Sequence, residues 1–305
     1  MPLVLAATKY GCRVFDGSAE ADVELENRPI AALAPEPDGT CVAVVEGREL
    51  WRRSADGTWS RVATAPANLE SVLVADHTIY CGALEGAELF RCVDAAAPER
   101  LEGFDNVPGR DEWHAGGPPL SVRSLTATAD GHALMAAVHV GGIARSTDRG
   151  QTWTPTIPIE FDVHEVRAHR SLPVVAAAAA VGLCVSHDDG ENWKVLADGL
   201  DPAYSLAVAL LEDEVLFSVQ DGPFPDRSQI WRWNIAIDEN RLEQVRDGLP
   251  RFLEGKVDSA HLAAHDGRTA LIDGGGNLWL SSNGSRDWQR IADDLQHAYG
   301  VVLLD

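Results

Sequence analysis

The sequence predicts an all-β fold: a single seven-bladed β-propeller of four-stranded blades that spans residues 1–305. Two observations predict it. A turn motif containing Ser, Asp, Gly and Trp recurs along the chain, and seven apolar segments align with one another, mostly at spacings near ~40 residues. This spacing is the usual length of one blade, and all-β propellers of this size form one domain.

The turn motif is clearest in residues 142–153 and 182–193, with weaker copies at 277–288 and 50–59. Each strong copy starts at a glycine, alternates apolar and polar residues as a strand does, and ends in Ser-x-Asp-x-Gly-x-x-Trp. Ser and Asp side chains hydrogen-bond backbone groups in tight turns, Gly permits a positive φ, and Trp packs against the hairpin. We therefore expect these boxes to lock turns and not to bind ligands.

The motif resembles the Asp-box, or BNR repeat, of sialidase-like β-propellers, which also occurs in sorting-receptor propellers and in photosystem II assembly factor-like proteins. As a repeat, the resemblance covers nearly the whole chain. It implies the propeller fold, but it leaves the activity open because enzymes and non-enzymes share the box.

The inner strand of each blade is expected at one of the seven aligned segments, each with an aliphatic residue two places after its first residue. The segments begin at Arg28, Glu70, Arg123, His164, Tyr204, Ala260 and Tyr299. Residues 3–25 supply outer strands with no inner strand before them, whereas the last segment has no outer strands after it. The C-terminal strand should therefore complete the N-terminal blade and close the ring, which removes exposed sheet edges.

The first residues of these segments should surround a funnel, because every inner strand of a propeller starts at the same face. All of them except Ala260 are polar or charged, which predicts an axial binding pocket, with a merely solvated channel as the alternative. Arg28 and Arg123 would clamp the carboxylate, phosphate or sulfate of a small anionic ligand, for which a sugar derivative is one option. The rival arrangement is that both arginines pair with Glu70.

The reaction, if there is one, stays open between hydrolysis and elimination. The sialidase resemblance implies an arginine triad and a tyrosine nucleophile helped by a glutamate, for which Glu70 with Tyr299 or Tyr204 would serve. The sequence departs from that pattern, because the ring has two arginines, Arg28 is followed by Pro-Ile where the family has Ile-Pro, and the blades number seven where sialidases have six. His164 with Tyr204 would instead suit proton abstraction beside a carboxylate, as in propeller polysaccharide lyases.

Two longer loop regions are expected on the same face as lids. The first, residues 101–120, carries Trp113 and His114, which we expect to bind the ligand together with His139 from a neighbouring turn. The second combines residues 220–229, including Phe224, with residues 250–256, including Phe252.

Two alternatives involve other partners. A non-enzymatic interaction or assembly-factor propeller would dock a protein on an exposed Trp113 or Phe252. No cofactor is predicted, although His164, His114, His139 and His297 leave a divalent metal as an option without close ligand spacing.

The overall charge excludes two classes of partner. A formal net charge of −22 argues against nucleic acid and against anionic membrane surfaces. No stretch approaches the ~20 apolar residues of a membrane span, and the N-terminus lacks the basic region of a secretory signal, so we expect a cytoplasmic protein. The five cysteines form no CxxC pair and are expected to be buried in strands.

Overall fold

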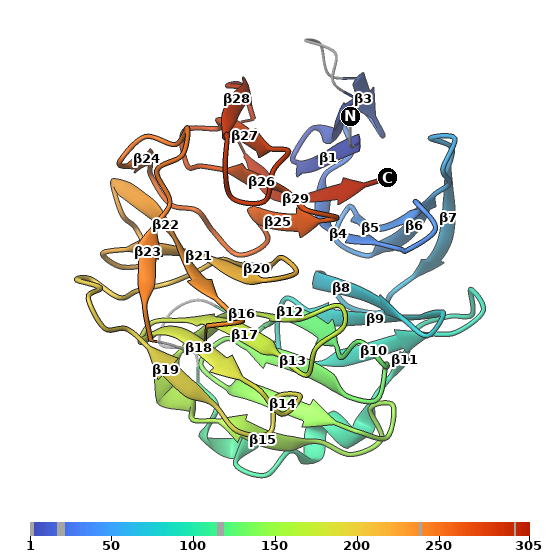
Figure 1. Cartoon of the computed structure of the whole chain (residues 1–305). Helices are drawn as coiled ribbons and strands as arrows, with labels where there is room; N and C mark the ends of the chain where they lie inside the picture. Colours follow the sequence, from blue (N-terminus) through green and yellow to red (C-terminus); the bar gives the residue numbers. More distant parts are fainter. Residues whose placement is uncertain (1–2, 17–21, 115–118, 238–239, 296) are drawn as a thin grey trace.

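The computed structural model describes residues 3–16, 22–114, 119–237, 240–295 and 297–305. Their strands form seven antiparallel sheets arranged as blades around one axis (Figure 1), which confirms the predicted seven-bladed propeller. The first strand of each blade lies nearest the axis. No described helix is long and apolar enough to cross a membrane.

Each blade is a meander of four strands. Blade 1 contains β29 (Ala298–Leu304), β1 (Leu3–Thr8), β2 (Gly11–Phe15) and β3 (Asp22–Glu24). Blade 2 contains β4 (Ile30–Pro35), β5 (Cys41–Val45), β6 (Glu49–Arg53) and β7 (Trp59–Thr64). Blade 3 contains β8 (Leu69–Ala75), β9 (Thr78–Ala83), β10 (Leu89–Cys92) and β11 (Glu99–Arg100).

The remaining blades repeat this order. Blade 4 contains β12 (Val122–Ala127), β13 (Leu134–Val138), β14 (Gly142–Ser146) and β15 (Thr154–Ile157). Blade 5 contains β16 (Val163–Ala168), β17 (Val175–Ala179), β18 (Gly182–Ser186) and β19 (Lys194–Leu196). Blade 6 contains β20 (Val208–Leu210), β21 (Glu214–Gln220), β22 (Arg227–Asn234) and β23 (Leu242–Gln244), with β24 (Leu253–Glu254) also paired to β22. Blade 7 contains β25 (Leu262–His265), β26 (Arg268–Ile272), β27 (Leu278–Ser281) and β28 (Gln289–Ala292).

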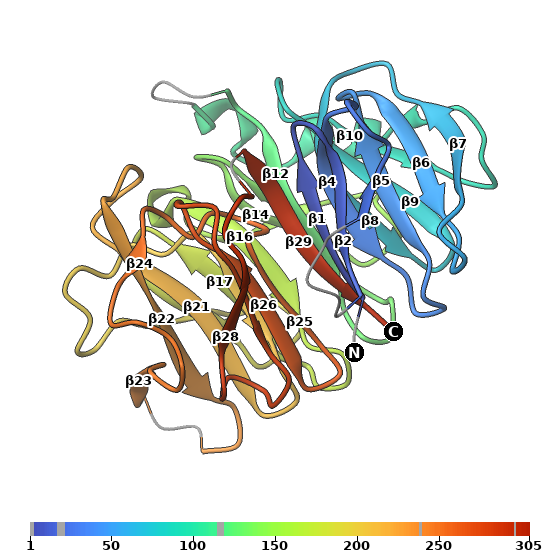
Figure 2. The same cartoon turned by 90° about the horizontal axis from the view of Figure 1, so that it is seen from above.

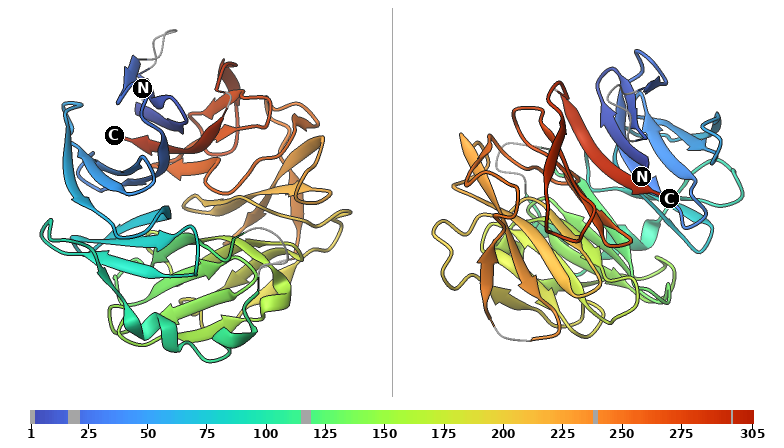
Figure 3. Two further views of the ribbon diagram at one scale, coloured as in Figure 1. Left: turned by 180° about the vertical axis from the view of Figure 1, so that it is seen from behind. Right: turned by 45° about the horizontal axis from the view of Figure 1, so that its top comes forward.

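The ring closes between the two ends of the chain. β29 pairs antiparallel with β1 from Leu3↔Leu304 to Thr8↔Ala298, so the last strand is the inner strand of blade 1. Figures 2 and 3 show the two strands side by side, β29 in red and β1 in blue. The predicted closure is confirmed.

The core lies between the blades. Among the described residues, the buried apolar side chains form seven clusters, and each cluster fills the interface between two neighbouring blades. Both faces of a middle strand are therefore buried, which explains why β17 reads as an uninterrupted run of Val and Ala. The five cysteines are all buried and free, as expected.

The strong boxes form closed turns after the third strand of their blades. In blade 4, Asp148 accepts hydrogen bonds from the Ser146 hydroxyl (2.8 Å) and from the backbone N–H of Thr152 (2.9 Å). Trp153 donates its indole N–H to the carbonyl of Gly150 at 3.0 Å, and Gly150 has φ of 84°. Residues 186–193 repeat the same Ser–Asp bonds in blade 5. The boxes thus lock turns.

The first long loop, residues 101–120, was expected to expose Trp113, but this side chain is buried. Residues 101–113 form two short 3₁₀ helices, η1 (Glu102–Asn106) and η2 (Arg110–Glu112), and pack between blades 3 and 4. Trp113 is only 7% exposed, stacks near Phe104 at 5.7 Å between ring centroids, and lies against Gly141. The prediction that Trp113 offers an exposed docking surface is therefore wrong, because the indole fills the wedge between two blades.

Candidate functional site

The face where the inner strands start holds an axial cavity of about 240 Å³, which we call the outer cavity. Its polar lining includes Glu70, Ser121, Arg123, His139, His164 and Tyr204. Lys256 and Asp258 border it from the loop before β25, and Phe224 borders it from the loop between β21 and β22. Phe224 is 92% exposed.

A second cavity of about 190 Å³, the inner cavity, continues along the axis between the inner strands. Tyr299, Ala260 and Arg167 contribute to its lining. Glu70, Arg123 and Asp258 border both cavities and form a charged belt between them.

β-bulges at the starts of the inner strands explain which side chains reach the axis. The register with the second strand shifts there, and one residue is left without a partner. The unpartnered residues are Ala31, Glu70, Arg123, His164 and Tyr299. A bulge bends its strand and re-aims the extra side chain, as is common next to functional sites.

Arg123 is the cation at the centre of the belt. Its side chain is 19% exposed, and its only ion pair among the described residues is with Asp258, at 3.6 Å between Nη2 and Oδ1. Lys256 forms a much closer ion pair with the other oxygen of Asp258. Burial opposes ionisation of Asp258, but the nearby charges, with Lys256 first, outweigh it and keep its pKa below the usual value.

Glu70 is the second carboxylate of the belt, and its pKa is shifted in the opposite direction from that of Asp258. Burial raises the pKa of Glu70, and the charge of Asp258 adds to this, against the lowering effects of Ser121 and Arg123. Its Oε2 atom is buried and has no hydrogen-bond partner among the described residues.

His164 and Tyr204 form a hydrogen-bonded pair on adjacent blades. His164 is 1% exposed, and its Nδ1–H donates to the carbonyl of Ser205 at 2.8 Å. In the neutral imidazole, Nε2 is then the acceptor, and the Tyr204 hydroxyl lies 3.0 Å from it. Asp162 Oδ2 lies 3.4 Å from the same nitrogen. It would accept a hydrogen bond from Nε2–H of a protonated His164 ring. Burial, followed by the charge of Asp162, raises the pKa of Tyr204 to about 12.

The structure brings together most of the predicted site residues. Glu70, Arg123, His139, His164 and Tyr204 all border the outer cavity, and Tyr299 borders the inner one. His139 is 8% exposed, and burial together with Arg123 lowers its pKa.

Arg28 does not belong to this group, and its predicted role as a clamp, or as a partner of Glu70, is wrong. Its guanidinium pairs with Glu46 at 3.0 Å and with Glu49 at 2.6 Å, and it stacks on the Trp51 ring at 4.6 Å. The bulge of blade 2 falls at Ala31, three residues later, so an alanine takes the axial position.

Two further ligand-binding predictions lack support from the positions of the residues. Trp113 is enclosed in the core, as described above. His114 is exposed, with Nδ1 2.9 Å from the carbonyl of Glu112, and it does not border either axial cavity. Residues 115–118 of the same loop lie outside the described residues.

Sequence reasoning missed Asp258, Lys256, Ser121 and Asp162. All four lie just before an inner strand, and the search by alignment considered only the first residue of each aligned segment. A usable signal is Asp162 two residues before His164, and Asp258 two residues before Ala260, because both place a carboxylate at the end of the loop that opens on the axis.

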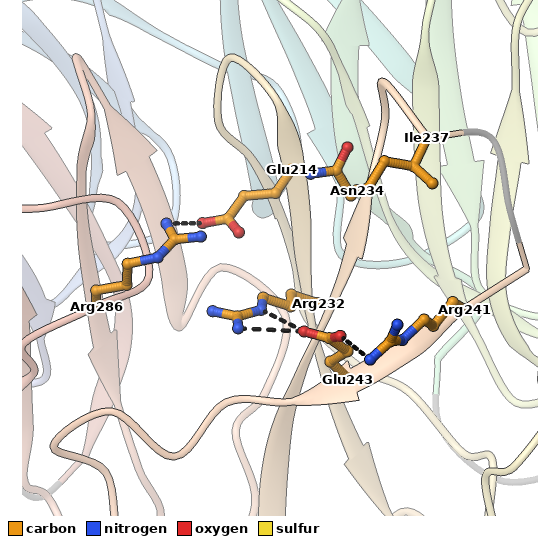
Figure 4. A pocket seen from close by; sticks show the side chains of 7 residues that line it. All are labelled: Glu214, Arg232, Asn234, Ile237, Arg241, Glu243 and Arg286. Carbon is orange, nitrogen blue, oxygen red and sulfur yellow. Dashed lines mark hydrogen bonds and ion pairs between the residues drawn. The ribbon is translucent and has the colours of Figure 1, made fainter.

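A separate cavity of about 150 Å³ lies between blades 6 and 7, away from the axis (Figure 4). Its charges are already paired. Arg232 bonds Glu243 at 3.2 Å, Arg241 bonds the same carboxylate at 2.8 Å, and Arg286 lies 3.7 Å from Glu214. Arg232 also lies 3.5 Å from Asp247, so each of the three arginines has a carboxylate partner, and we do not consider this cavity a ligand site. No group of three or more His, Cys, Asp or Glu side chains among the described residues could hold a metal ion.

No protein-family model and no curated protein matches the sequence. Solved structures do match in fold. A GH74 xyloglucanase from Xanthomonas campestris has a TM-score of 0.61 and 16% identity, over 86% of this chain and 45% of that chain. An ancestral GH74 enzyme has a TM-score of 0.64 and 12% identity, over 90% of this chain and 38% of that chain.

Two further matches come from protein assemblies. A chain of a nidogen/laminin complex has a TM-score of 0.58 and 10% identity, over 100% of this chain and 99% of that chain. A chain of a mitotic checkpoint complex has a TM-score of 0.62 and 14% identity, over 96% of this chain and 84% of that chain. This chain spans less than half the length of either GH74 enzyme. At these identities the comparisons show that the chain shares the β-propeller fold.

Proposed function

We propose that the axial cavities bind a small anionic ligand, with Arg123 as the main anchor. The observation that carries the proposal is the bonding of Arg123: among the described residues its guanidinium makes no hydrogen bond and has one long ion pair, at 3.6 Å. The side chain is 19% exposed at the cavity, and a guanidinium forms forked bonds to carboxylates and phosphates. Lys256 also borders the outer cavity, where it is paired with Asp258.

The test is isothermal titration calorimetry with organic acids, acidic sugars and phosphates, using wild type, Arg123→Ala and Arg28→Ala. Arg28 is a matched control, because it lies at the start of the same kind of strand but is paired within its own blade. Loss of a charge-assisted bond of about 1.5–3 kcal/mol should weaken binding roughly 10- to 100-fold in Arg123→Ala. Arg28→Ala should bind normally. Absence of binding to wild type, or equal binding to all three proteins, would contradict the proposal.

Chemical turnover of the ligand is a separate step, and here we propose Glu70 as the proton donor. A general acid works best when its pKa lies near the working pH, and burial moves that of Glu70 in this direction. The lyase option instead uses the hydrogen-bonded pair of His164 and Tyr204 to abstract a proton beside a carboxylate. The fold neighbours include glycoside hydrolases, which is consistent with hydrolysis. Product analysis with acidic glycosides that bind through Arg123 should show cleavage of the glycosidic bond in wild type and none in Glu70→Gln.

A protein-interaction propeller is the second candidate, and one observation favours it. Phe224 is 92% exposed at the edge of the outer cavity, and two fold neighbours are chains of protein complexes. In this case Phe224→Ser should abolish co-purification of a partner, while Arg123→Ala retains it. The opposite pattern would assign the face to the small ligand.

A further inference from the structure

The belt between the two cavities offers hydrogen-bond acceptors as well as a cation. Glu70 borders both cavities, and its Oε2 has no donor among the described residues. A buried acceptor without a donor is unfavourable. A ligand that placed an O–H or N–H group here would remove that cost.

Tyr204 provides a second acceptor on the other side of Arg123. The Nδ1–H of His164 is committed to the Ser205 carbonyl, so the neutral ring can only accept at Nε2, where it meets the Tyr204 hydroxyl at 3.0 Å. In this form of the ring, the Tyr204 hydroxyl donates a hydrogen bond to Nε2 of His164. The Tyr204 oxygen then has only lone pairs free toward the outer cavity, so it can accept a hydrogen bond from a donor group of the ligand.

We infer that the ligand is a hydroxycarboxylic acid, whose carboxylate binds Arg123 and whose neighbouring hydroxyl groups donate to Glu70 and Tyr204. This inference rests on the proposed function and narrows it to one ligand class. A fully ionised phosphate or sulfate has no proton to donate, and it carries at least one more negative charge than a carboxylate, which would lie beside Asp258. The outer cavity of about 240 Å³ is smaller than pockets for drug-sized ligands, so it suits a molecule no larger than one sugar unit.

The experiment compares three probes that differ in these features: D-gluconate, a carboxylate with hydroxyl groups; hexanoate, which has the same carbon chain without them; and inorganic sulfate. Calorimetry at pH 8 would use wild type, Glu70→Leu, Tyr204→Phe and Arg123→Ala, with near-ultraviolet circular dichroism to verify folding. We expect gluconate to bind wild type at least about tenfold tighter than hexanoate, with sulfate weaker still. Glu70→Leu should weaken gluconate about tenfold and leave hexanoate unchanged, and Tyr204→Phe should have a smaller effect of the same kind.

The outcomes separate the two proposals. If gluconate and hexanoate bind equally through Arg123, or if sulfate binds tightest, the inference about hydroxyl groups is overturned while anion binding stands. If Glu70→Leu weakens both carboxylates equally, the inference is again overturned. If no probe depends on Arg123, the proposed function itself fails. If Glu70→Leu does not fold, Glu70→Gln replaces it, and an unchanged ratio of gluconate to hexanoate affinity in that variant counts against the inference.

Discussion

The propeller has one face with the Asp-box turns, the box face, and one face with the axial cavities, the axial face. Both faces carry carboxylates, but those of the box turns are hydrogen-bonded within the fold, whereas Glu70 on the axial face has an oxygen without a partner among the described residues. On the box face, the carboxylate of Asp148 accepts bonds from Ser146 and Thr152 within its own turn. Partial burial opposes its ionisation, but these bonds outweigh it and lower the pKa of Asp148. On the axial face, burial raises the pKa of Glu70, and one of its oxygens has no partner among the described residues.

The difference separates residues that maintain the fold from residues available to a ligand. An Asp whose oxygens are satisfied within a turn contributes to stability and has little left to offer a ligand. In the belt, Arg123 and Glu70 have few hydrogen-bond partners. This lowers the stability of the fold but leaves their polar atoms free to bind a ligand. Composition alone does not distinguish the faces, because Ser, Asp and His occur on both.

The largest effect is expected from a change that should destroy both faces. Deletion of residues 299–305 removes most of β29 and leaves β1 without its inner neighbour. We expect the loss of a cooperative unfolding transition in calorimetry. Deletion of Asp305 alone, which removes only its 3.2 Å ion pair with His265, is the control and should melt like wild type. A 299–305 deletion that melts cooperatively at the wild-type temperature would refute ring closure as a requirement for folding.

A box tryptophan should affect stability and leave the axial face intact. Trp153 is 4% exposed and packs edge-on against Phe104 at 5.1 Å. Trp153→Ala should lower the free energy of unfolding by about 3–5 kcal/mol in denaturant titrations. Trp59, in a worn copy of the box, is only half-buried, so Trp59→Ala should cost less. Ligand affinity through Arg123 should stay unchanged in both, and a large loss of affinity in Trp153→Ala would show that the two faces are coupled.

The smallest effect is expected at Glu70, and its sign is the informative part. Because the pKa of Glu70 is raised in the folded protein, the folded state binds this proton more tightly than the unfolded state, and the ionised form destabilises the fold at higher pH. Glu70→Gln should therefore raise the melting temperature by about 2 °C at pH 8 and by nothing measurable at pH 4. A decrease at pH 8 would mean that the carboxylate is a structural bond of the belt.

The sequence predicted the architecture well because the repeat is local. A box, a glycine and an alternating strand identify each hairpin without knowledge of the rest of the chain, and the leftover strand at the C-terminus required ring closure. The candidate site was predicted in part. The β-bulges at the starts of the described inner strands leave five residues unpaired, and the alignment named four of them: Glu70, Arg123, His164 and Tyr299. It missed the fifth, because a bulge depends on the register between two strands, which the alignment of apolar residues does not report.

Two examples show the limit. In blade 2 the alignment placed Arg28 on the axis, but the register shift falls at Ala31, and Arg28 is paired with Glu46 and Glu49. Trp113 was expected in solvent as part of the long loop of residues 101–120, yet it is enclosed between blades beside Phe104. Both outcomes depend on contacts between segments that are distant in sequence.

The pairing of β1 with β29 has a consequence for the order of folding. Leu3 meets Leu304, so the two strands are joined by a loop that contains all the other blades. Contacts between residues so far apart in sequence have a high loop-closure cost and tend to form late. Until the ring closes, the edge of β1 lacks its partner and is open to pairing with other chains, so the unclosed propeller is a form that needs protection from aggregation.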